Sequence, residues 1–378
     1  MDVSAESVRL LVAAGGTGGH VYPGIAIAEE WVRQHPGSAV TFVGTARGIE
    51  SKAVPAAGFD FRAIDARGLP RRPSLELFAA TAAFLRGFGQ VAAIIKEVKP
   101  HVILATGGYV SGPAAIWARL LGIPLVLQEQ NSVPGAANRW LSLIASEVHI
   151  SFVESRSYFR RRNNLKVSGN PIRRSLLLHD RAGAYEALGL DPERRTLLVF
   201  GGSHGASSIN RAVAGALPLL ARVGRLQAVW QTGTKDNEEM VSLAKGLPMP
   251  VRVVPYLDQI DKAYAVADLA VCRAGAMTIT ELTACGVPSI LVPYPHAARD
   301  HQTQNARGLV DRGAAEMIPD AELAPQDLAA RIEVLFRDES RLRRMARNAR
   351  AFARTNAAEK IARSIEALAG LAGPVDES

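Results

Sequence analysis

The chain has 378 residues, of which 48% are hydrophobic, so it can bury a large core and its length predicts two domains. No apolar run reaches the 18 residues of a membrane span, and the N-terminus lacks the basic and then apolar pattern of a signal peptide, so we expect a cytoplasmic protein. Two cysteines, Cys272 and Cys285, are too few for a disulfide framework and are expected to be buried as small apolar residues.

The net charge of +8 is concentrated in the first half, because residues 1–168 carry 18 basic and 12 acidic residues. Such an excess suits nucleic acid, an anionic membrane surface or a phosphorylated substrate. Aromatic residues make up only 6% of the chain and are not interleaved with the basic ones, as they are on single-strand binding platforms. We therefore predict no nucleic-acid partner.

The first half alternates short apolar runs with helix-length segments. An apolar run at residues 10–14 leads into GGTGGHVYPG at 15–24 and then into helical apolar spacing at 25–33. Further predicted strands lie at 40–43, 102–105, 125–127 and 148–150, with a predicted helix at 75–98. This alternation predicts an α/β domain with a doubly wound parallel sheet.

The first glycine loop is expected to bind a ligand closely, because Gly16, Gly18 and Gly19 leave its backbone accessible. A dinucleotide fold requires a third glycine where Val21 stands and an acidic residue at the end of the second strand. Neither is present, and no glycine precedes Lys-Ser or Lys-Thr in a Walker A frame. We therefore predict no nicotinamide or flavin cofactor.

Two more segments of the first half follow predicted strands, where ligands bind in open α/β sheets. One is GGYVSGP at residues 107–113, and the other is QEQNSVPGAANRW at residues 128–140. Glu129 and Asn131 can hydrogen-bond sugar hydroxyls. Alternatively, an Asn or Ser here caps the helix expected to begin near Pro134.

The second half restarts the same pattern after a Gly- and Pro-containing break at residues 168–171. GGSHGASSIN at 201–210 repeats the glycine and hydroxyl order of residues 15–19, which predicts two similar halves. We place the domains at 1–168 and 169–378, the second ending in helices over 325–369. The strands of this half are predicted at 195–200, 227–230, 251–254, 268–272 and 289–292.

Residues 268–293 are predicted to form a phosphate-binding strand, loop and helix. Gly275 allows a sharp turn into a helix starting near Thr278, whose free amides suit a diphosphate. Glu281 can accept hydrogen bonds from both hydroxyls of a ribose. The alternative is a capping box in which Thr278 is the cap and Glu281 follows three residues later. Gln302 and Asn305 either contact the same ligand or cap the next helix.

Seven motifs, in this order over residues 15–306, closely resemble one family: GGTGGHVYPG, GGYVSGP, QEQNSVPGAAN, GNPIR, GGSHGASS, CRAGAMTITEL and DHQTQNA. The chain resembles the MurG family. That family transfers N-acetylglucosamine from UDP to the muramyl sugar of lipid I and forms lipid II in peptidoglycan synthesis. The resemblance implies a GT-B fold of two Rossmann-like domains, an inverting hexosyltransferase, the donor on the second domain and the lipid-linked acceptor on the first. It also implies a peripheral position on the cytoplasmic face of the inner membrane.

The resemblance also assigns substrate-binding residues. It implies that the first domain uses Thr17, Gly18, Gly19 and Asn131, and that Arg173 and Ser203 contact the diphosphate region. For the rest of the donor it implies Leu257, Ala276, Met277, Thr278, Ile279, Thr280, Glu281 and Gln302. The sequence departs from the family pattern in two places, where Gln128 replaces His and His204 replaces Gln.

Inverting transfer needs a base for the acceptor hydroxyl and stabilisation of the leaving diphosphate. Histidine titrates near working pH, so His20 is the preferred base and Glu129 the second candidate. The alternative role for His20 is hydrogen-bond donation to phosphate or backbone. No Asp-x-Asp occurs in the chain, so we expect no metal; the helix at residues 276–278 and Arg173 would stabilise the diphosphate instead.

A membrane-binding surface is predicted over residues 67–88, where Arg67, Arg71, Arg72 and Arg86 surround apolar side chains such as Phe84. The alternative is a helix whose apolar stripe faces the core. Two other functions compete with transfer: a UDP-sugar 2-epimerase and a catalytically silent membrane scaffold. The presence of Glu281, Asn131 and His20 argues against the scaffold.

Overall fold

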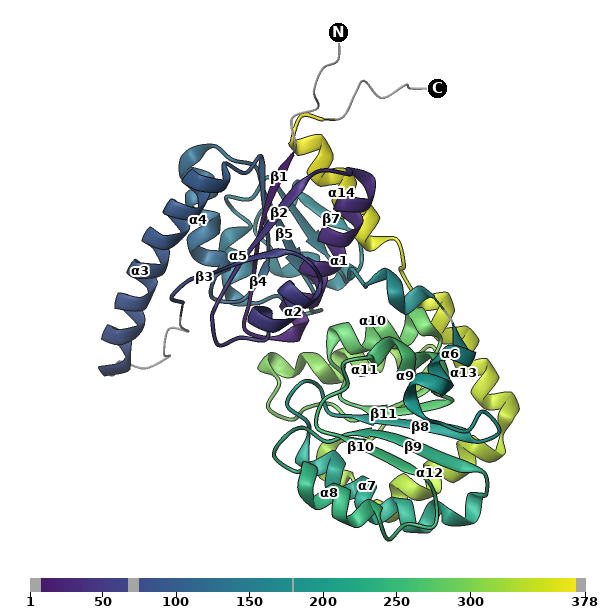
Figure 1. The fold of residues 1–378 in the computed structure, drawn as a ribbon. Helices are drawn as coiled ribbons and strands as arrows, with labels where there is room; N and C mark the ends of the chain where they lie inside the picture. Colours follow the sequence, from purple (N-terminus) through teal and green to yellow (C-terminus); the bar gives the residue numbers. More distant parts are fainter. Residues whose placement is uncertain (1–7, 67–74, 179, 372–378) are drawn as a thin grey trace, which may run out of the picture. The chain divides into compact units, whose positions relative to one another are not determined.

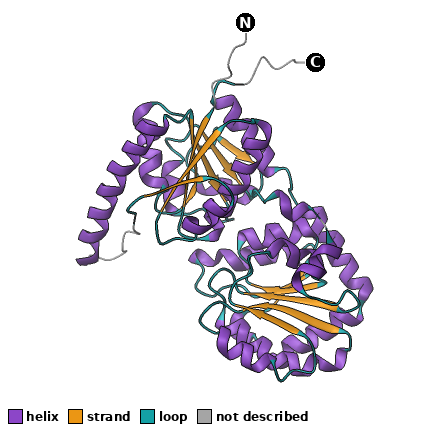
Figure 2. Cartoon of the chain, viewed as in Figure 1, coloured by secondary structure: helices purple, strands orange, loops and turns teal. Residues whose placement is uncertain are grey.

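The computed structural model describes residues 8–66, 75–178 and 180–371. Within these ranges, the side chains of residues 75–81 and of Ala298 are not described. Its described residues form two compact units: one up to Arg173 together with those from Arg354 on, and one of Arg174–Ala353. Each is a parallel β-sheet covered by helices (Figures 1 and 2). The predicted α/β class with two Rossmann-like domains is therefore confirmed.

The first unit contains a seven-stranded parallel sheet of order β3-β2-β1-β4-β5-β6-β7. Its interior strand β1 is almost wholly apolar and pairs with both neighbours, so that Val12 lies opposite Phe42 and Leu104. Burial on both faces explains this composition. The strands are β1 (Arg9–Ala14), β2 (Ala39–Gly44), β3 (Asp60–Ala63), β4 (Val102–Gly107), β5 (Leu125–Glu129), β6 (Glu147–Ile150) and β7 (Leu165–Val167).

Helices cover both faces of this sheet and complete two apolar cores. The predicted helix over residues 75–98 is present with those bounds. The helices are α1 (Gly18–Gln34), α2 (Glu50–Ala56), α3 (Leu75–Val98), α4 (Ser111–Leu121), α5 (Ala136–Leu141) and α14 (Ala357–Leu368), with a 3-10 turn at Val153–Tyr158. None of the helices among the described residues is long and apolar enough to cross a membrane.

Helix α14 belongs to the first unit, although its sequence follows the second. Ile361, Ala362 and Ile365 are buried in the core that contains Trp31 of α1. The apolar stripe of an amphipathic helix packs against another apolar surface, and here α1 supplies that surface. The predicted domain boundary lies at residue 168, with all later residues in the second domain. In the structure, the second unit begins at Arg174 and ends at Ala353.

A partly buried polar cluster links α14 to the sheet. Burial raises the pKa of Glu147, but hydrogen bonds from His149, Lys166 and Ser364 outweigh it and lower this pKa to about 2. Lys166 Nζ lies 2.7 Å from Glu147 Oε1 and 3.0 Å from Ser364 Oγ. Burial also lowers the pKa of His149, whose Nδ1 lies 2.7 Å from Ser168 Oγ.

This cluster predicts that acid destabilises the first unit. Both folded-state pKa values are depressed, so stability is present above the unfolded values and falls as pH drops below about 6.5 for His149 and from about 4.5 towards 2 for Glu147. We expect Glu147 to account for about 1 to 3 kcal/mol. Hydrogen exchange of residues 147–150 at decreasing pH measures this, and Glu147→Gln should remove the part below pH 4.5. An unchanged pH dependence in that variant would contradict the assignment.

The second unit contains a six-stranded parallel sheet of order β10-β9-β8-β11-β12-β13. Its strands are β8 (Arg195–Phe200), β9 (Leu226–Gln231), β10 (Val251–Val254), β11 (Leu269–Cys272), β12 (Ser289–Leu291) and β13 (Ala315–Met317). Its helices are α6 (Arg181–Leu188), α7 (Ser207–Leu220), α8 (Asn237–Ala244), α9 (Ile260–Val266), α10 (Ala276–Cys285), α11 (His301–Val310), α12 (Pro325–Arg337) and α13 (Glu339–Phe352). Short 3-10 turns lie at Arg174–Leu177, Ala221–Val223, Ala298–Asp300 and Asp320–Glu322.

Both sheets reverse their strand order at one position, between β1 and β4 in the first unit and between β8 and β11 in the second. Ligands of open α/β sheets bind outside the carboxyl ends of the strands at such a switch point. The four glycine-containing segments predicted to bind ligand follow these four strands. The topology therefore brings each pair of predicted loops to one sheet edge within its own unit.

Two of the helix starts differ from the predictions. Helix α1 begins at Gly18, so Gly18, Gly19 and His20 form its first turn. Helix α10 begins at Ala276 after Gly275, which means that Thr278 is not a cap and the capping-box alternative is wrong. Gly275 has an ordinary φ of −65°, so its conformation does not require glycine.

Candidate active site

The loop after β1 places an open helix N-terminus at the switch point. Gly16 has φ +89°, which favours glycine, and the repeated Gly202 in the second unit has the same φ. His20 N and Val21 N donate the first bonds of α1 to Thr17 O. The amides of Gly18 and Gly19 precede these bonds, so they are free of the helical ladder and available to a ligand oxygen.

His20 is held in one tautomer by the neighbouring strands. Its Nδ1 lies 3.2 Å from Thr106 O and 3.2 Å from Gln130 Oε1, and both are acceptors. Nδ1 therefore carries the ring proton, which leaves the lone pair on Nε2. Gly107 makes room for this ring, since a Cβ there would collide with Nδ1. His20 is only partly buried, so the arrangement suits a general base.

Unlike His20, Glu129 is fully engaged in contacts within its own loop. It is 1% exposed, and its carboxylate accepts four hydrogen bonds, from Asn131 N and Nδ2, Gly135 N and Asn138 Nδ2. Both oxygens are thus occupied in shaping the loop between β5 and α5. Because α5 begins at Ala136 after Gly135, neither Asn131 nor Ser132 caps it. Asn131 remains partly exposed on this loop.

The two departures from the family pattern lie in different surroundings. Gln128 is buried, and its Nε2 donates to Asn170 Oδ1 at 3.1 Å. It also accepts from Gln130, the residue that contacts His20. Gln128 therefore supports the position of His20 indirectly, through Gln130. His204 is exposed beside Ser203, with 3.1 Å between Nδ1 and Ser203 Oγ.

In the second unit, the N-terminus of α10 is held in place at the carboxyl edge of the sheet. Arg273 Nη1 donates to Val292 O and Pro293 O, both at 3.2 Å, and also binds Asp320. Its Nη2 donates to Ser208 Oγ at 2.8 Å. These contacts fix the loop that precedes α10. Arg273 was not predicted as a site residue, although it lies inside one of the seven motifs.

The residues implied for the donor phosphates differ in accessibility. Ile279 N donates to Gly275 O, so the amides of Ala276, Met277 and Thr278 are the ones outside the helical ladder. The Ile279 side chain is 1% exposed and can contact no ligand. The Thr280 hydroxyl donates to Ala276 O at 2.8 Å. The anion-binding capacity therefore rests on backbone amides.

Glu281 lies further along the same helix and has a buried partner. The Tyr264 hydroxyl donates to Glu281 Oε2 at 3.1 Å. Burial and the neighbouring carboxylate raise the pKa of Tyr264 well above its usual value, so the phenol keeps its proton and remains a donor. This bond orients a partly exposed carboxylate. Tyr264 was not predicted as a site residue.

Three other implied residues are already engaged. Arg173, in the first unit, has its Cζ 4.9 Å from the ring centroid of Tyr22, and its guanidinium partly offsets the burial that raises the pKa of Glu29. Gln302 Oε1 accepts from Tyr294 N at 2.9 Å. Leu257 is 6% exposed after β10. Asn305 is buried and donates to Ala274 O, so it supports the α10 loop.

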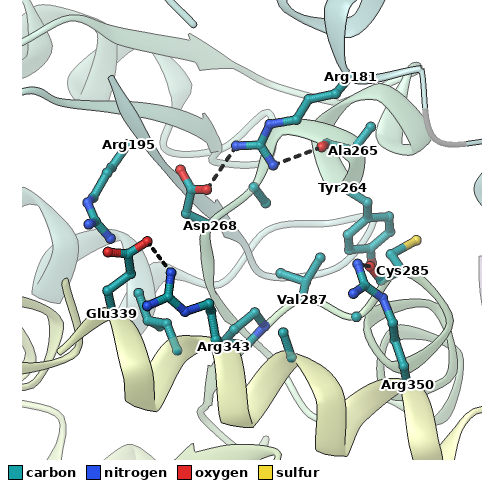
Figure 3. Close-up of a pocket in the computed structure, with 15 residues that line it drawn as sticks. Arg181, Arg195, Tyr264, Ala265, Asp268, Cys285, Val287, Glu339, Arg343 and Arg350 are labelled. Atoms are coloured by element: carbon teal, nitrogen blue, oxygen red, sulfur yellow. Dashed lines mark hydrogen bonds and ion pairs between the residues drawn. The ribbon is translucent and has the colours of Figure 1, made fainter. Parts of the chain in front are cut away.

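A cavity of about 410 Å³ in the second unit has Tyr264 in its lining but none of the other site residues named above (Figure 3). It is lined by Arg195, Asp268 and Pro288, which mark the amino ends of β8, β11 and β12. Asp268 pairs with Arg181 at 2.9 Å, and Glu339 pairs with Arg343 at 2.7 Å. Because ligands of such sheets bind at the carboxyl ends, this cavity is not the predicted donor site.

Two doubly wound units, each with a glycine loop at its switch point, have the architecture of the GT-B fold, which includes glycosyltransferases. The glycosyltransferase family 28 N-terminal domain model matches residues 10–150, and the corresponding C-terminal domain model matches residues 196–363. The chain belongs to glycosyltransferase family 28 and, within it, to the MurG family.

The similarity to named relatives covers nearly the whole chain. The UDP-N-acetylglucosamine–N-acetylmuramyl-(pentapeptide) pyrophosphoryl-undecaprenol N-acetylglucosamine transferase of Geobacter metallireducens is 44% identical over 94% of this chain and 97% of its own. The protein of the same name from Chlorobaculum parvum is 43% identical, over 96% and 99%. The crystal structure of Acinetobacter baumannii MurG matches with a TM-score of 0.71 and 31% identity, over 95% and 99%.

A solved UDP-N-acetylglucosamine 2-epimerase has a TM-score of 0.70 but only 13% identity. That similarity is one of fold alone.

Proposed function

We propose that this protein transfers N-acetylglucosamine from UDP-N-acetylglucosamine to the muramyl sugar of lipid I, giving lipid II. The observation that carries the proposal is the 44% identity over nearly the full length to a transferase named for this reaction. The named donor and acceptor also match the chemistry of the site, since a UDP-sugar requires anion-binding amides and an acceptor hydroxyl requires a base.

In the donor half, the first amides of α10 would hold the diphosphate and Glu281 the ribose hydroxyls. A helix N-terminus carries about half a positive charge, which stabilises the charge that develops on departing UDP. The partly exposed Met277 and Thr278 and the exposed Ser203 support contact with the donor at this edge. The roles implied for Arg173, Leu257 and Gln302 belong to the same proposal.

In the acceptor half, His20 would be the general base. Its Nε2 would take the proton of the acceptor hydroxyl while that oxygen bonds to the anomeric carbon and the bond from this carbon to UDP breaks. Attack from the face opposite UDP inverts the configuration. The fixed Nδ1 proton supports this assignment over Glu129, whose two oxygens already accept four bonds. Thr17, Gly18, Gly19 and Asn131 would contact the transferred sugar.

The test of the function is UDP release with and without a lipid I analogue. The proposal expects release only when the acceptor is present. A 2-epimerase would change UDP-N-acetylglucosamine without any acceptor, and a silent scaffold would give neither result. Acceptor-independent conversion of the donor would overturn the proposal.

The lipid-linked acceptor also requires contact with the bilayer, and we propose that the surface around the first part of α3 provides it on the cytoplasmic side. Arg67, Arg71 and Arg72 lie outside the described residues. Leu85 supports the proposal because it is 64% exposed. Phe88 instead stacks on Trp117 with ring centroids 4.8 Å apart, so it belongs to the core side of the helix.

We predict that Leu85→Ser and Arg71→Glu/Arg72→Glu each weaken binding to anionic liposomes by several-fold. An exposed apolar side chain inserts shallowly, and each basic residue near an anionic leaflet adds about 1 kcal/mol. Sedimentation with anionic and neutral liposomes measures both effects. The control is Leu243→Ser, which removes an exposed leucine from the second unit. If the control and all variants bind anionic liposomes equally, α3 is not part of the membrane-binding surface.

A further inference from the structure

Glu50 is a buried carboxylate beside the first glycine loop that the proposed chemistry does not use. It is 0% exposed at the start of α2. Its Oε2 accepts from Gly16 N at 3.1 Å, and its Oε1 accepts from Thr45 N and Thr45 Oγ1, both at 2.8 Å. One side chain thus joins the loop after β1 to the end of β2.

The surroundings of Glu50 are shaped to hold it. A Cβ at Gly15 would lie 2.8 Å from Oε1, and one at Gly44 would lie 2.5 Å from Cγ. A Cβ at Gly48 would also collide with the carboxylate. Three separate glycines therefore leave room for this one side chain. Among the described residues no basic side chain forms an ion pair with Glu50, so hydrogen bonds compensate its burial.

The donors around Glu50 explain why a carboxylate stands there. Gly16 N and Thr45 N can only donate, so each needs an acceptor. A carboxylate offers two acceptor oxygens, whereas an amide would direct its own N–H groups at one of these donors. The peptide that Glu50 holds lies directly before Thr17 and the first turn of α1. On the other side of the glycine loop, Gly108 lies so close to Gly15 O that a Cβ on Gly108 would collide with it.

We infer that Glu50 is a positioning residue for the glycosyl transfer. By holding Gly16 N, it sets the path of the glycine loop and thereby the amides of Gly18 and Gly19 and the ring of His20. It touches neither substrate, and the inference rests on the proposed function. Small displacements of a catalytic group cost far more in turnover than in binding of a ligand held elsewhere.

The main test compares Glu50→Gln with wild type in transfer to a lipid I analogue. We expect kcat to fall about tenfold to a hundredfold, because the loop that carries His20 is displaced. The dissociation constant for UDP-N-acetylglucosamine, measured by calorimetry, should change less than about threefold, because α10 and Glu281 lie in the other unit. Hydrogen exchange should become faster at residues 15–20.

Two controls separate positioning from general stability. Asn164→Ala removes buried bonds to Ser142 O and Ala145 O in the same unit, away from the loop, and should lower the melting temperature without lowering kcat. Thr45→Val removes one donor to Oε1 but leaves the bond to Gly16, so it should keep kcat near the wild-type value. Gly48→Ala keeps the carboxylate but pushes it aside, and should reproduce the loss seen in Glu50→Gln.

The outcomes are distinct. A normal kcat in Glu50→Gln overturns the positioning role. So does a loss of kcat no larger than that of Asn164→Ala when the two variants are equally stable. If Glu50→Gln does not fold, Gly48→Ala decides by the same measurements. If wild type itself transfers no sugar, the proposed function fails. In that case, faster exchange at residues 15–20 in the folded variants would still support control of the loop by Glu50, and unchanged exchange would refute it.

Discussion

His20→Ala is expected to lower kcat by about 10² to 10⁴-fold, which is the usual contribution of a positioned general base. The donor dissociation constant should change little, because the ring is fixed by Thr106 O and Gln130 Oε1 rather than by groups of the second unit. Steady-state kinetics with a lipid I analogue, together with calorimetry of donor binding, measure the two quantities separately.

His20→Asn provides the matched control. Asparagine retains a short N–H donor towards Thr106 O but has no group that takes a proton near neutral pH. If kcat falls as far in this variant as in His20→Ala, the function that both variants lack is that of a general base. Recovery of most activity in His20→Asn, or a loss confined to donor affinity, would show that His20 is a hydrogen-bond donor.

Glu281→Ala is expected to raise the KM for UDP-N-acetylglucosamine by about 10 to 150-fold. This corresponds to loss of about 1.5 to 3 kcal/mol from hydrogen bonds to a charged group. The carboxylate is partly exposed on α10, so the fold should survive its removal. Initial rates at varied donor concentration measure the effect, with circular dichroism to confirm folding.

A graded series makes this prediction sharper. Tyr264→Phe removes only the bond that orients Glu281 Oε2, so it should raise KM by a smaller factor, about two- to tenfold. Glu238→Ala removes an exposed carboxylate from α8 and should leave KM unchanged. If Tyr264→Phe and Glu281→Ala both match Glu238→Ala, Glu281 has no contact with the donor.

The sequence was sufficient for the sheets because most of their strands are buried on both faces. The run Leu197–Phe200 contains no polar residue, and the strand predicted at residues 195–200 has the bounds of β8. Three strands were missed, namely β3, β7 and β13, which are three or four residues long and partly exposed. Such short edge strands carry too little apolar pattern to be distinguished from loops.

The side-chain chemistry was less predictable because it depends on contacts distant in sequence. His20 gains its tautomer from Gln130, 110 residues away, and Glu281 gains its orientation from Tyr264 on another helix. Glu50 carries no motif signal, since its partner Gly16 lies 34 residues earlier. Helix α14 lies in the helical stretch predicted at residues 325–369, but a helical pattern does not say which sheet covers its apolar face.

Glu129 has a local sequence signal, but its surroundings also depend on the folded loop. A carboxylate after a strand, among amides, is a reasonable candidate for binding hydroxyls. Its partners Asn131, Gly135 and Asn138 lie within nine residues, but only the folded loop shows that they occupy both oxygens. A carboxylate that accepts this many bonds is more useful as a scaffold than as a base.

The measurement that most directly tests the proposed reaction is the structure of its product. Purified protein is incubated with UDP-N-acetylglucosamine and a lipid I analogue in the presence of chelator, and the lipid product is analysed by mass spectrometry and NMR. We predict a mass increase of one N-acetylhexosamine residue and a β-glycosidic bond to the muramyl sugar. An unmodified acceptor, or conversion of the donor to its 2-epimer, would contradict the assignment.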